Sequence, residues 1–359
     1  MNDEQRPLVL LGGGHAHVVA LREWLEQRRK PPAGSLLISP DRYGWYSGMM
    51  PGLLAGRYRL EDCRIDLRTL CRACGVELWI DSASGLDADQ MTLRLGSGNK
   101  LQAELLSLNI GSVPPLPDIS NSVIEVLPAK PFSIPVAAWQ RWRTTGAPRS
   151  MAVLGGGAAA FELAMALNSS LPDCEVQIIS GSSLLGGHHQ RVHHRARQLL
   201  AGYGVSLTEH CHVTRVHGDE LFADDRSIGH ADAVIVATGA GAFDWPRHSG
   251  LACQDGFVRI DATLRSVSHR TVFATGDCAA LPRTPHAGVY AVRQGKTLAA
   301  NLMAALHDQP MERYHPQRRA LALLATGDGR ALLSYGAMAA HNRLLGRWKD
   351  HLDTAFIRA

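Results

Sequence analysis

The sequence lacks any long uninterrupted apolar run of the kind that crosses a membrane. Its most apolar long window, Met151 to Leu167, contains Glu162 and three consecutive glycines, so it indicates a strand, a turn and a helix. A basic start followed by an apolar stretch, as in a secretory signal, is also missing, since polar residues lead directly into a strand. We therefore expect a soluble, cytoplasmic protein.

Neither sign of charge is in strong excess. The chain has 37 Lys and Arg against 33 Asp and Glu, a net charge of +4, and no long basic run. Such a weak balance gives no reason to expect a nucleic-acid partner. With 359 residues, of which 45% are hydrophobic, the chain is long enough for two or three domains with separate cores.

Cysteine is sparse and scattered, with seven residues in the chain. Only Cys71 and Cys74 have the spacing of a redox motif, and they fall on a predicted helix that ends at Gly75, where packing is the more common role. No second ligand pair has zinc spacing, and the histidines at 188–189 and 193–194 are interpreted as a solvated helix face. We expect no metal site.

Two glycine-rich turns, a domain's length apart, are the most informative features present. Gly12 to Gly14 follows the apolar run 8–11, and Gly155 to Gly157 follows the apolar run 151–154. In each case a strand pattern runs into Gly-x-Gly and then into a helical pattern. The glycines let the backbone approach a pyrophosphate, and the helix N-terminus points N–H groups at it. Two such turns predict two adenine dinucleotides, hence a flavin and a nicotinamide.

The surrounding pattern is an internal repeat of a nucleotide-binding fold. Residues 8–38 and 150–180 both read as strand, glycine turn, helix and strand, and the apolar runs 105–111 and 233–239 both end at glycine. A further strand, 271–277, delivers Asp277 at its carboxyl end, where open parallel sheets bind ligands. The predicted fold class is α/β: two Rossmann-like FAD/NAD(P)-binding domains of the three-layer ββα/βαβ type, with a small C-terminal α+β tail.

With these motifs the chain resembles the pyridine nucleotide-disulfide oxidoreductase superfamily. The fingerprints, the strand ends at 237–239 and 275–278, and the segment 287–295 follow the family's order. Within it, the segments 46–52 and 348–350 resemble a group related to type II NADH dehydrogenases, found fused to or beside selenide, water dikinases. The resemblance implies FAD-binding segments at 1–116 and 246–310, an NAD(P)-binding domain at 117–245, and a tail or interface unit at 311–359.

The resemblance also implies the residues that hold FAD and NAD(P)H. Gly12, Gly14 and the helix start would hold the FAD pyrophosphate, Asp277 the ribityl chain, and Gly155 and Gly157 the nicotinamide dinucleotide. The full implied set is Gly12, Gly14, His15, Ala16, His17, Ser39, Pro51, Gly111, Gly155, Gly157, Ala158, Ala159, Glu162, Thr238, Gly239, Gly276, Asp277, Ala287, Gly288 and Val289.

The implied reaction is hydride transfer from NAD(P)H to the flavin, followed by passage of electrons to a small-molecule acceptor such as a quinone. Three residues are catalytic candidates. Glu162 resembles the family's glutamate that faces nicotinamide and flavin, with a solvated helix flank as the alternative. His286 precedes the helix 288–306 and would supply a proton or charge to the reduced flavin, with a surface loop as the alternative. Gln294 matches a glutamine near the quinone in type II NADH dehydrogenases.

Departures from the family pattern bear on the mechanism. The loop 43–52 has no cysteine, so we expect electrons to leave the flavin without a redox disulfide. Ser39 and Ser180 stand where an acid would bind a ribose 2′-OH, and His188, His189 and Arg191 lie nearby, so NADH and NADPH both stay open. His17 replaces a small residue of the first fingerprint, which predicts looser helix packing.

Other functions and contacts also stay open. The chain could be an NAD(P)H-binding flavoprotein sensor with little turnover, or a sulfide- or selenium-species oxidoreductase, although only Cys278 lies in the matched flavin motifs. In the final helix, the apolar residues 344, 345, 348, 352 and 356 are interpreted as one face. We expect that face to pack in the core or in a homodimer, with peripheral contact at the inner face of a membrane as the alternative.

Overall fold

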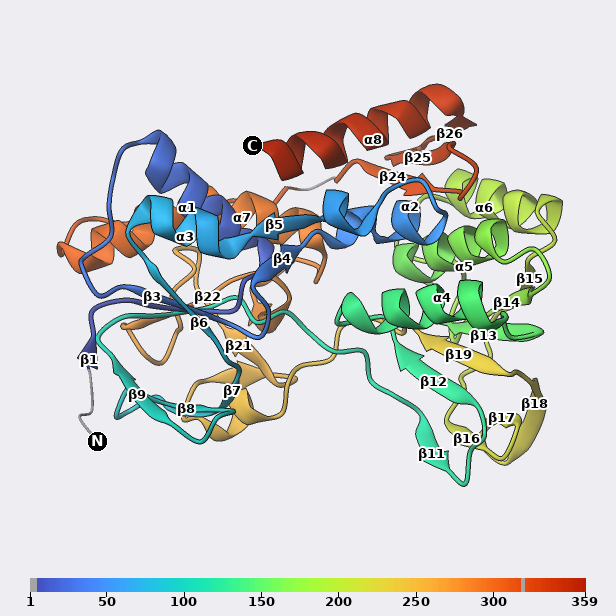
Figure 1. The fold of residues 1–359 in the computed structure, drawn as a ribbon, viewed down its shortest axis with the longest axis horizontal. Helices are drawn as coiled ribbons and strands as arrows, with labels where there is room; N and C mark the ends of the chain where they lie inside the picture. The colour runs from blue at the N-terminus through green and yellow to red at the C-terminus, as the bar shows by residue number, and fades with distance from the viewer. Residues whose placement is uncertain (1–4, 318–319) are drawn as a thin grey trace. The chain divides into compact units, whose positions relative to one another are not determined.

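A computed structural model describes residues 5–317 and 320–359 of the chain (Figure 1). The described residues form two compact units, each made of segments that are distant in sequence. Unit 1 comprises residues 5–46, 64–112 and 241–317, and unit 2 comprises residues 47–63, 113–240 and 320–359. Each unit is built around a five-stranded parallel sheet, so the predicted α/β class is confirmed.

The parallel sheet of unit 1 has the strand order β22-β10-β2-β3-β6. Its strands are β2 (Val9–Leu11), β3 (Leu36–Ser39), β6 (Glu77–Ile80), β10 (Leu106–Leu108) and β22 (Val272–Ala274). The helices of this unit are α1 (His15–Glu26), α3 (Leu67–Cys74) and α7 (Gly288–Leu306), with 3-10 turns η3 (Trp245–His248) and η4 (Gly276–Cys278). The predicted repeat unit at 8–38 is therefore present.

Helices α1 and α7 pack closely against each other. Trp24 is 1% exposed, and its indole N–H donates to the carbonyl oxygen of Ala299 at 3.0 Å. A Cβ on Gly295 would lie 2.4 Å from Val19, so only glycine lets the two helices approach this closely. The prediction of looser packing around His17 is wrong, because this histidine is fully buried within the unit.

Smaller sheets complete unit 1. A mixed four-stranded sheet has the order β1-β9-β8-β7. Its strands are β1 (Gln5–Arg6), β7 (Ala83–Asp87), β8 (Thr92–Leu95) and β9 (Lys100–Ala103). A second set joins β20 (Cys253–Gln254), β21 (Phe257–Arg259) and β23 (Ala279–Ala280), and β4 (Tyr43–Trp45) pairs with β5 (Arg64–Asp66).

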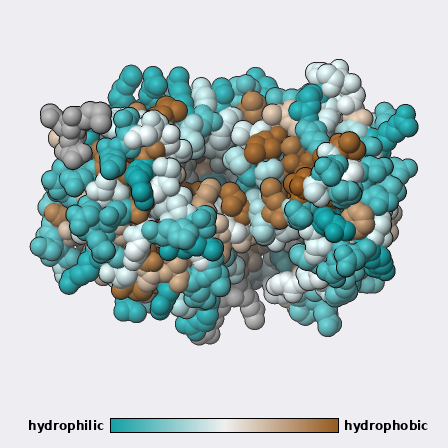
Figure 2. Space-filling view, turned by 90° about the horizontal axis from the view of Figure 1, so that it is seen from below, coloured by the Kyte–Doolittle hydropathy of each residue, from teal (hydrophilic) through white to brown (hydrophobic). Residues whose placement is uncertain are grey.

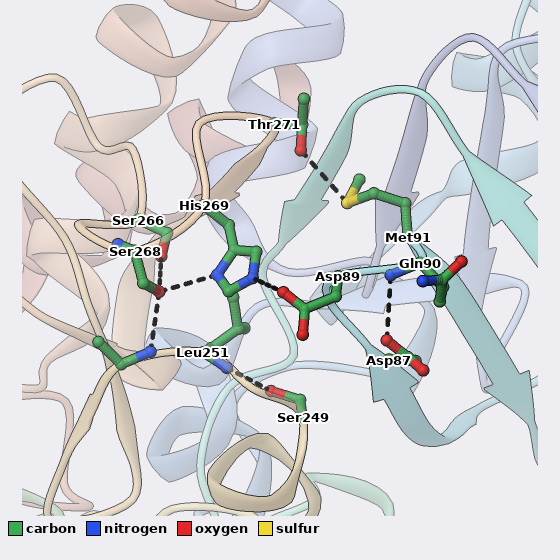
Figure 3. Close-up of polar contacts among 11 residues, drawn as sticks. Asp87, Asp89, Gln90, Met91, Ser249, Leu251, Ser266, Ser268, His269 and Thr271 are labelled. Carbon is green, nitrogen blue, oxygen red and sulfur yellow. Dashed lines mark hydrogen bonds and ion pairs between the residues drawn. The ribbon is translucent and has the colours of Figure 1, made fainter.

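Polar contacts join the turn between β7 and β8 to the segment 249–271 (Figure 3). His269 contacts Asp89 Oδ1 through Nε2 at 3.1 Å and Ser268 Oγ through Nδ1 at 2.9 Å. The same serine oxygen accepts the Ala252 N–H at 2.9 Å, and it contacts the Ser266 hydroxyl at 3.2 Å. The Ser268 oxygen is thus already hydrogen-bonded to the backbone and to a side chain. These Ser, His and Asp side chains therefore join two loops and do not form an activated nucleophile.

The parallel sheet of unit 2 has the order β12-β19-β13-β14-β15. Its strands are β12 (Glu125–Pro128), β13 (Ser150–Leu154), β14 (Glu175–Ile179), β15 (Ser206–Thr208) and β19 (Ala233–Val236). The helices are α4 (Ser133–Thr145), α5 (Ala158–Ser170) and α6 (Gln190–Gly202). A four-stranded sheet adds β11 (Asp118–Ser120), β16 (Arg215–His217), β17 (Glu220–Ala223) and β18 (Arg226–His230).

Unit 2 also contains the tail of the chain and a short segment from the first fifth of the sequence. The tail forms β24 (Ala322–Ala325), β25 (Ala331–Tyr335), β26 (Met338–Asn342) and α8 (Arg343–Arg358). The short segment forms η1 (Ser47–Met49), α2 (Met50–Leu54) and η2 (Leu60–Cys63), and α2 packs on α5. The tail from residue 320 onward packs in the same unit as residues 113–240.

The tail helix α8 turns much of its apolar face outward. Leu344, Trp348 and Leu352 are 71%, 43% and 44% exposed, so the core half of the prediction is wrong for these three residues, and packing in a homodimer stays a prediction. Gly346, Lys349 and Asp353 point inward in its place. The charged residues face inward because Lys349 pairs with Glu162 on α5 and with Asp353 on α8 itself.

One face of the molecule can be followed in Figure 2. On the face drawn in Figure 2, apolar residues gather in small groups between hydrophilic ones. Over the ranges that the structure describes, no helix combines the length and the apolarity needed to cross a membrane.

Candidate cofactor and nucleotide sites

The first glycine turn is dictated by the close approach of the backbone to Asn109. Gly12 has a φ of +100°, and a Cβ there would lie 2.3 Å from the Asn109 carbonyl oxygen. A Cβ on Gly14 would lie 2.2 Å from the Asn109 side-chain oxygen. Gly14 is the N-cap of α1, which has no side-chain cap. The packing of the protein therefore requires both glycines, whatever binds above them.

Asn109 is the residue that holds this site together. Its Oδ1 accepts the N–H groups of Ala16 at 3.1 Å and His17 at 3.4 Å, and its Nδ2 donates to the Thr275 carbonyl at 2.9 Å. The side chain thereby joins the start of α1 and the ends of β10 and β22. Sequence reasoning missed this role, and the only signal was a polar residue inside the apolar run 105–111.

His17 has a structural role here. It is fully buried, its Nδ1 lies 2.7 Å from the Gly12 carbonyl oxygen, and its Nε2 lies 2.8 Å from Ser107 Oγ. Because a carbonyl can only accept, the proton sits on Nδ1 and the Ser107 hydroxyl donates to Nε2. Burial lowers the pKa of His17 to about 4, so the ring stays neutral. With both ring nitrogens engaged inside the protein, a ligand-binding role for this side chain is corrected to a positioning role.

The turn after β22 places Asp277 at the edge of the sheet. Gly276 has a φ of +67°, and its N–H donates to Gln294 Oε1 at 2.6 Å. Ser112 Oγ donates to Asp277 Oδ2 at 3.1 Å. Gln294 is only 2% exposed, and its Oε1 accepts the N–H group of this turn. The interpretation of Gln294 as a catalytic residue is therefore corrected.

The other residues assigned to FAD border the same edge of the sheet. Ser39 is 3% exposed, and its hydroxyl lies next to Gly13. The His15 and Tyr46 rings contact each other edge-on, with ring centroids 5.3 Å apart. Gly111 has a φ of +75°, and a Cβ on it would meet nothing within 4 Å, which leaves open space beside the end of β10.

The start of α7 is open to a ligand. Ala287 is its N-cap with no side-chain hydrogen bond, and Gly288 and Val289 begin the helix. Uncapped N–H groups and the helix dipole favour negative charge at this point. His286 is exposed and stacks on Phe257, with ring centroids 4.1 Å apart. This placement fits the surface-loop alternative as well as it fits a catalytic role.

The second glycine turn differs from the first in one informative way. Gly155 has a φ of +134°, and a Cβ there would lie 2.2 Å from the Ala237 carbonyl oxygen, so the fold itself requires glycine. Gly157 has an ordinary φ of −85°, and a Cβ on it would meet nothing within 4 Å. The residues Ala158 and Ala159 follow at the start of α5, which has no side-chain cap. The empty space over Gly157 fits a pyrophosphate.

Two further residues of this site lie at the end of β19. Thr238 is exposed and its hydroxyl donates to the Pro115 carbonyl oxygen at 3.1 Å. Gly239 follows with a φ of +112°, and a Cβ there would meet nothing within 4 Å. The carboxyl ends of β13 and β19 are neighbours in the sheet, so both residues border the second glycine turn.

Glu162 lies inside unit 2 and is paired with the tail helix. Its Oε1 accepts the Ala325 N–H at 2.8 Å and lies 3.8 Å from Lys349 Nζ. Lys349 also donates to the Gly48 carbonyl at 3.1 Å and lies 3.1 Å from Asp353 Oδ2. Burial raises the pKa of Glu162, an effect that the Lys349 charge opposes. The solvated-flank alternative for Glu162 is therefore wrong.

A second set of contacts fixes the inner side of α8. The Tyr58 hydroxyl donates to Asp350, whose other oxygen pairs with Arg57 at 2.6 Å. Pro51 is buried on α2 and lines a small cavity beside this set. The cavity has a volume of about 10 Å³, which is room for about one water molecule.

The thiols are poorly suited to redox chemistry. Cys278 is 4% exposed and donates to the Thr275 carbonyl at 3.2 Å, and burial raises its pKa to about 11. Cys71 and Cys74 are buried free thiols whose pKa values burial raises to about 12 and about 11. This agrees with the packing interpretation of the pair. Among the described residues, no group of three or more histidine, cysteine or acidic side chains is placed to hold a metal.

Each unit has a five-stranded parallel sheet and a glycine turn before a helix, and together they have the fold of two-dinucleotide-binding-domain flavoprotein reductases. The chain belongs to the family described as pyridine nucleotide-disulphide oxidoreductase, whose model matches residues 6–295. Members of this family are flavin-dependent NAD(P)H oxidoreductases. The comparisons lend no support to an association with selenide, water dikinases.

Two curated relatives illustrate the distance within the family. Human ferroptosis suppressor protein 1 is 27% identical over 248 residues, covering 65% of this chain and 64% of its own length. The chain thus spans slightly less than two thirds of that relative. NADH dehydrogenase-like protein YutJ of Bacillus subtilis is 20% identical over 357 residues, with 95% of each chain covered.

Solved structures show the same fold. The sulfide:quinone oxidoreductase of Aquifex aeolicus has a TM-score of 0.80 at 16% identity, covering 98% of this chain and 91% of that one. The water-forming NADH oxidase of Lactobacillus brevis bound to NADH has a TM-score of 0.74 at 20% identity, covering 92% and 75%. Its engineered NADPH-oxidase form bound to NADPH has the same TM-score and identity, covering 93% and 75%.

Proposed function

We propose that the protein binds FAD in unit 1 and NAD(P)H in unit 2, and passes electrons from the flavin to a small-molecule acceptor without a redox disulfide. The observation that carries this proposal is the pair of helices α1 and α5. Each starts at a glycine, which has no side chain of its own to cap the helix, at the carboxyl edge of a parallel sheet, although Asn109 Oδ1 takes two N–H groups of α1. That edge is where α/β folds bind dinucleotides.

The chain's own residues would hold and orient the cofactors. In unit 1, the backbone at Gly14 and His15 would face the FAD pyrophosphate. Asn109 fixes the turn, and Asp277 would accept hydrogen bonds from the ribityl hydroxyls. The open start of α7 would stabilise negative charge on the reduced ring. Bound FAD supplies the ability to accept a hydride and release electrons singly or in pairs.

The route out of the flavin does not use sulfur. The segment from Tyr43 to Gly52 has no cysteine, and Cys278 is buried with a raised pKa. Because the Gln294 amide is engaged by Gly276, that glutamine gives no support to a quinone site. A quinone is still the first acceptor to test, on the likeness to the NADH dehydrogenase-like protein. The alternative is a sensor that binds NAD(P)H and turns over slowly.

The test is anaerobic reduction of the purified yellow protein with NADH and with NADPH, followed by a panel of acceptors. We expect either nucleotide, or both, to bleach the flavin absorption band, and an acceptor to restore it rapidly. A long-lived reduced flavin that no quinone, oxygen or dye reoxidises would favour the sensor. A colourless protein that cannot be reconstituted with FAD would contradict both functions.

We also propose that the outer face of α8 contacts an anionic lipid surface. Leu344, Trp348 and Leu352 are exposed along one stripe, and Arg343 and Arg347 beside them are exposed too. The acidic residues Asp350 and Asp353 of the same helix point inward and are paired there. An exposed apolar stripe with exposed arginines beside it on the same helix matches an anionic membrane surface better than a second, equally basic copy.

Vesicle co-sedimentation checks this contact. We expect the protein to pellet with vesicles containing anionic phospholipid and to be released by salt, since part of the attraction is electrostatic. Trp348→Ser should weaken the binding roughly tenfold through lost apolar burial. Val267→Ser, at a residue 49% exposed in unit 1, is the matched control and should leave binding unchanged. Equal loss in both variants, or self-association without lipid binding, would argue against the proposal.

A further inference from the structure

We propose that the nucleotide is NADPH and that the turns after β14 and β15 take its 2′-phosphate. This inference rests on the proposed function, because it concerns the nucleotide that the second glycine turn would bind. In this type of fold, a carboxylate near the end of the second strand normally accepts the ribose 2′-OH of NADH. The corresponding end of β14 in this chain has a different chemistry.

Ser180 stands at the end of β14 but is closed off from a ligand. It is fully buried, and its Oγ would lie 2.1 Å from a Cβ on Gly156. The same oxygen accepts the Ser182 N–H at 3.3 Å. The residue in the acid's place therefore has no carboxylate and no free path to a ribose.

The next groups outward are hydroxyls and imidazoles. Gly181 and Ser182 are exposed, and the Nδ1 of His212 would lie 3.1 Å from a Cβ on Gly181. Ser183 Oγ and His210 Nε2 are 3.3 Å apart. The two turns are held side by side because the Cys211 N–H donates to the Ser180 carbonyl at 2.9 Å.

Residues 180–189 and 209–214 contain one carboxylate, that of Glu209, and its oxygens already accept hydrogen bonds within the protein. Glu209 accepts two hydrogen bonds from the Arg197 guanidinium, both at 2.9 Å, and one from the Leu184 N–H at 2.6 Å. The Arg197 hydrogen bond lowers the pKa of Glu209, so it stays ionised and paired. Glu209 therefore neither accepts a 2′-OH nor repels a phosphate.

His188 and His189, named from the sequence alone, each have one ring nitrogen engaged elsewhere in unit 2. His188 Nδ1 lies 2.6 Å from Ser334 Oγ, and His189 accepts the Arg191 N–H as the N-cap of α6. The relevant histidines, His210 and His212, come from the following turn, which is distant from them in sequence but adjacent in the sheet. A neutral imidazole still offers one N–H donor, and a protonated one offers two.

A ribose 2′-phosphate would thus find the Ser182 hydroxyl, imidazole donors and no unpaired carboxylate, whereas a 2′-OH would find no acidic acceptor. The fold alone does not decide between the nucleotides. An NADH oxidase and its engineered NADPH form match this chain with the same TM-score of 0.74. The choice therefore lies with local residues such as these.

The first experiment compares two ligands that differ only in the 2′-phosphate. Isothermal titration of the FAD-loaded protein with adenosine 2′,5′-bisphosphate and with 5′-AMP should give at least about tenfold tighter binding of the bisphosphate, a difference of about 1.4 kcal/mol. Equal affinities, or tighter binding of 5′-AMP, overturn the proposal. This readout needs no turnover. If neither nucleotide reduces the flavin, the proposed function fails while the phosphate preference is still measured.

Variants then assign the preference to these turns. Ser182→Asp adds a carboxylate and should remove the bisphosphate preference and lower the KM for NADH relative to that for NADPH. His212→Ala removes a donor and should weaken bisphosphate binding severalfold without affecting 5′-AMP. His194→Ala, an exposed histidine on α6, is the matched control. An unchanged ratio of the two affinities in both Ser182→Asp and His212→Ala contradicts the assignment.

Discussion

Replacement of Lys349 by methionine is expected to destabilise the protein by about 3–5 kcal/mol, the usual cost of breaking a buried ion pair by removing one partner. Lys349 lies between the carboxylates of Glu162 and Asp353. Its own burial lowers the pKa of the ammonium group, but the two carboxylates outweigh that effect and raise it. Methionine keeps most of the volume and removes the Lys349 cation from two buried carboxylates. Urea unfolding followed by circular dichroism measures the loss.

The loss should depend on pH in a defined direction. Burial already raises the pKa of Glu162 in the folded protein, and removal of Lys349 raises it further. A carboxyl group whose pKa is higher folded than unfolded binds more protons when folded, so stability falls as pH rises through the folded pKa. The Lys349→Met variant should therefore recover stability on mild acidification. The wild type should show much less recovery over the same range.

Two controls separate the ion pair from simple damage to α8. Arg347→Met removes a cation from the exposed side of the same helix and should change stability by less than about 1 kcal/mol. The double variant Glu162→Gln with Lys349→Met removes one charge of each sign and should recover part of the loss. If Lys349→Met unfolds no more easily than Arg347→Met, the buried pair does not stabilise unit 2.

The parts of the fold that repeat a local pattern could be predicted from the sequence. The runs before Gly12 and Gly155 are apolar enough to be buried strands, and the residues after each glycine turn have helical periodicity. The repeat at 105–111 and 233–239 gave two strands of the two parallel sheets, β10 and β19. These features need no knowledge of distant partners, because strand, turn and helix are neighbours along the chain.

The errors came from residues whose environment is set by distant segments. From the sequence, His17 is too large for its position in the glycine fingerprint. In the structure it is accommodated because Ser107, on another strand, hydrogen-bonds with it. Gln294 matches a motif, yet Gly276 takes its amide. Residues 344, 348 and 352 look like a core-facing stripe, but Lys349 and Asp353 turn inward because Glu162 lies there. Periodicity locates an apolar stripe on a helix. It does not show whether charged residues on another face of that helix have buried partners elsewhere in the fold.

Replacement of Gly157 by alanine is expected to weaken nucleotide binding by roughly ten- to a hundredfold while the protein folds normally. Its φ of −85° suits alanine, and the new methyl group would meet no protein atom within 4 Å. The methyl would fill the space above the start of α5 where a pyrophosphate must approach the backbone. Crowding of this kind costs about 1–3 kcal/mol. The measurement is the KM for nucleotide in anaerobic flavin reduction, with the melting temperature as the folding check.

Two further glycines make this result decisive. Gly202→Ala, at the end of α6, also meets no atom within 4 Å and should leave both KM and stability unchanged. Gly155→Ala would place a methyl 2.2 Å from the Ala237 carbonyl at a φ of +134°, so it should lower stability together with binding. Only Gly157→Ala is expected to separate the two readouts, because under the proposed function the nucleotide alone would restrict that position. A Gly157→Ala protein with unchanged KM would show that the open space over α5 is not where the nucleotide binds.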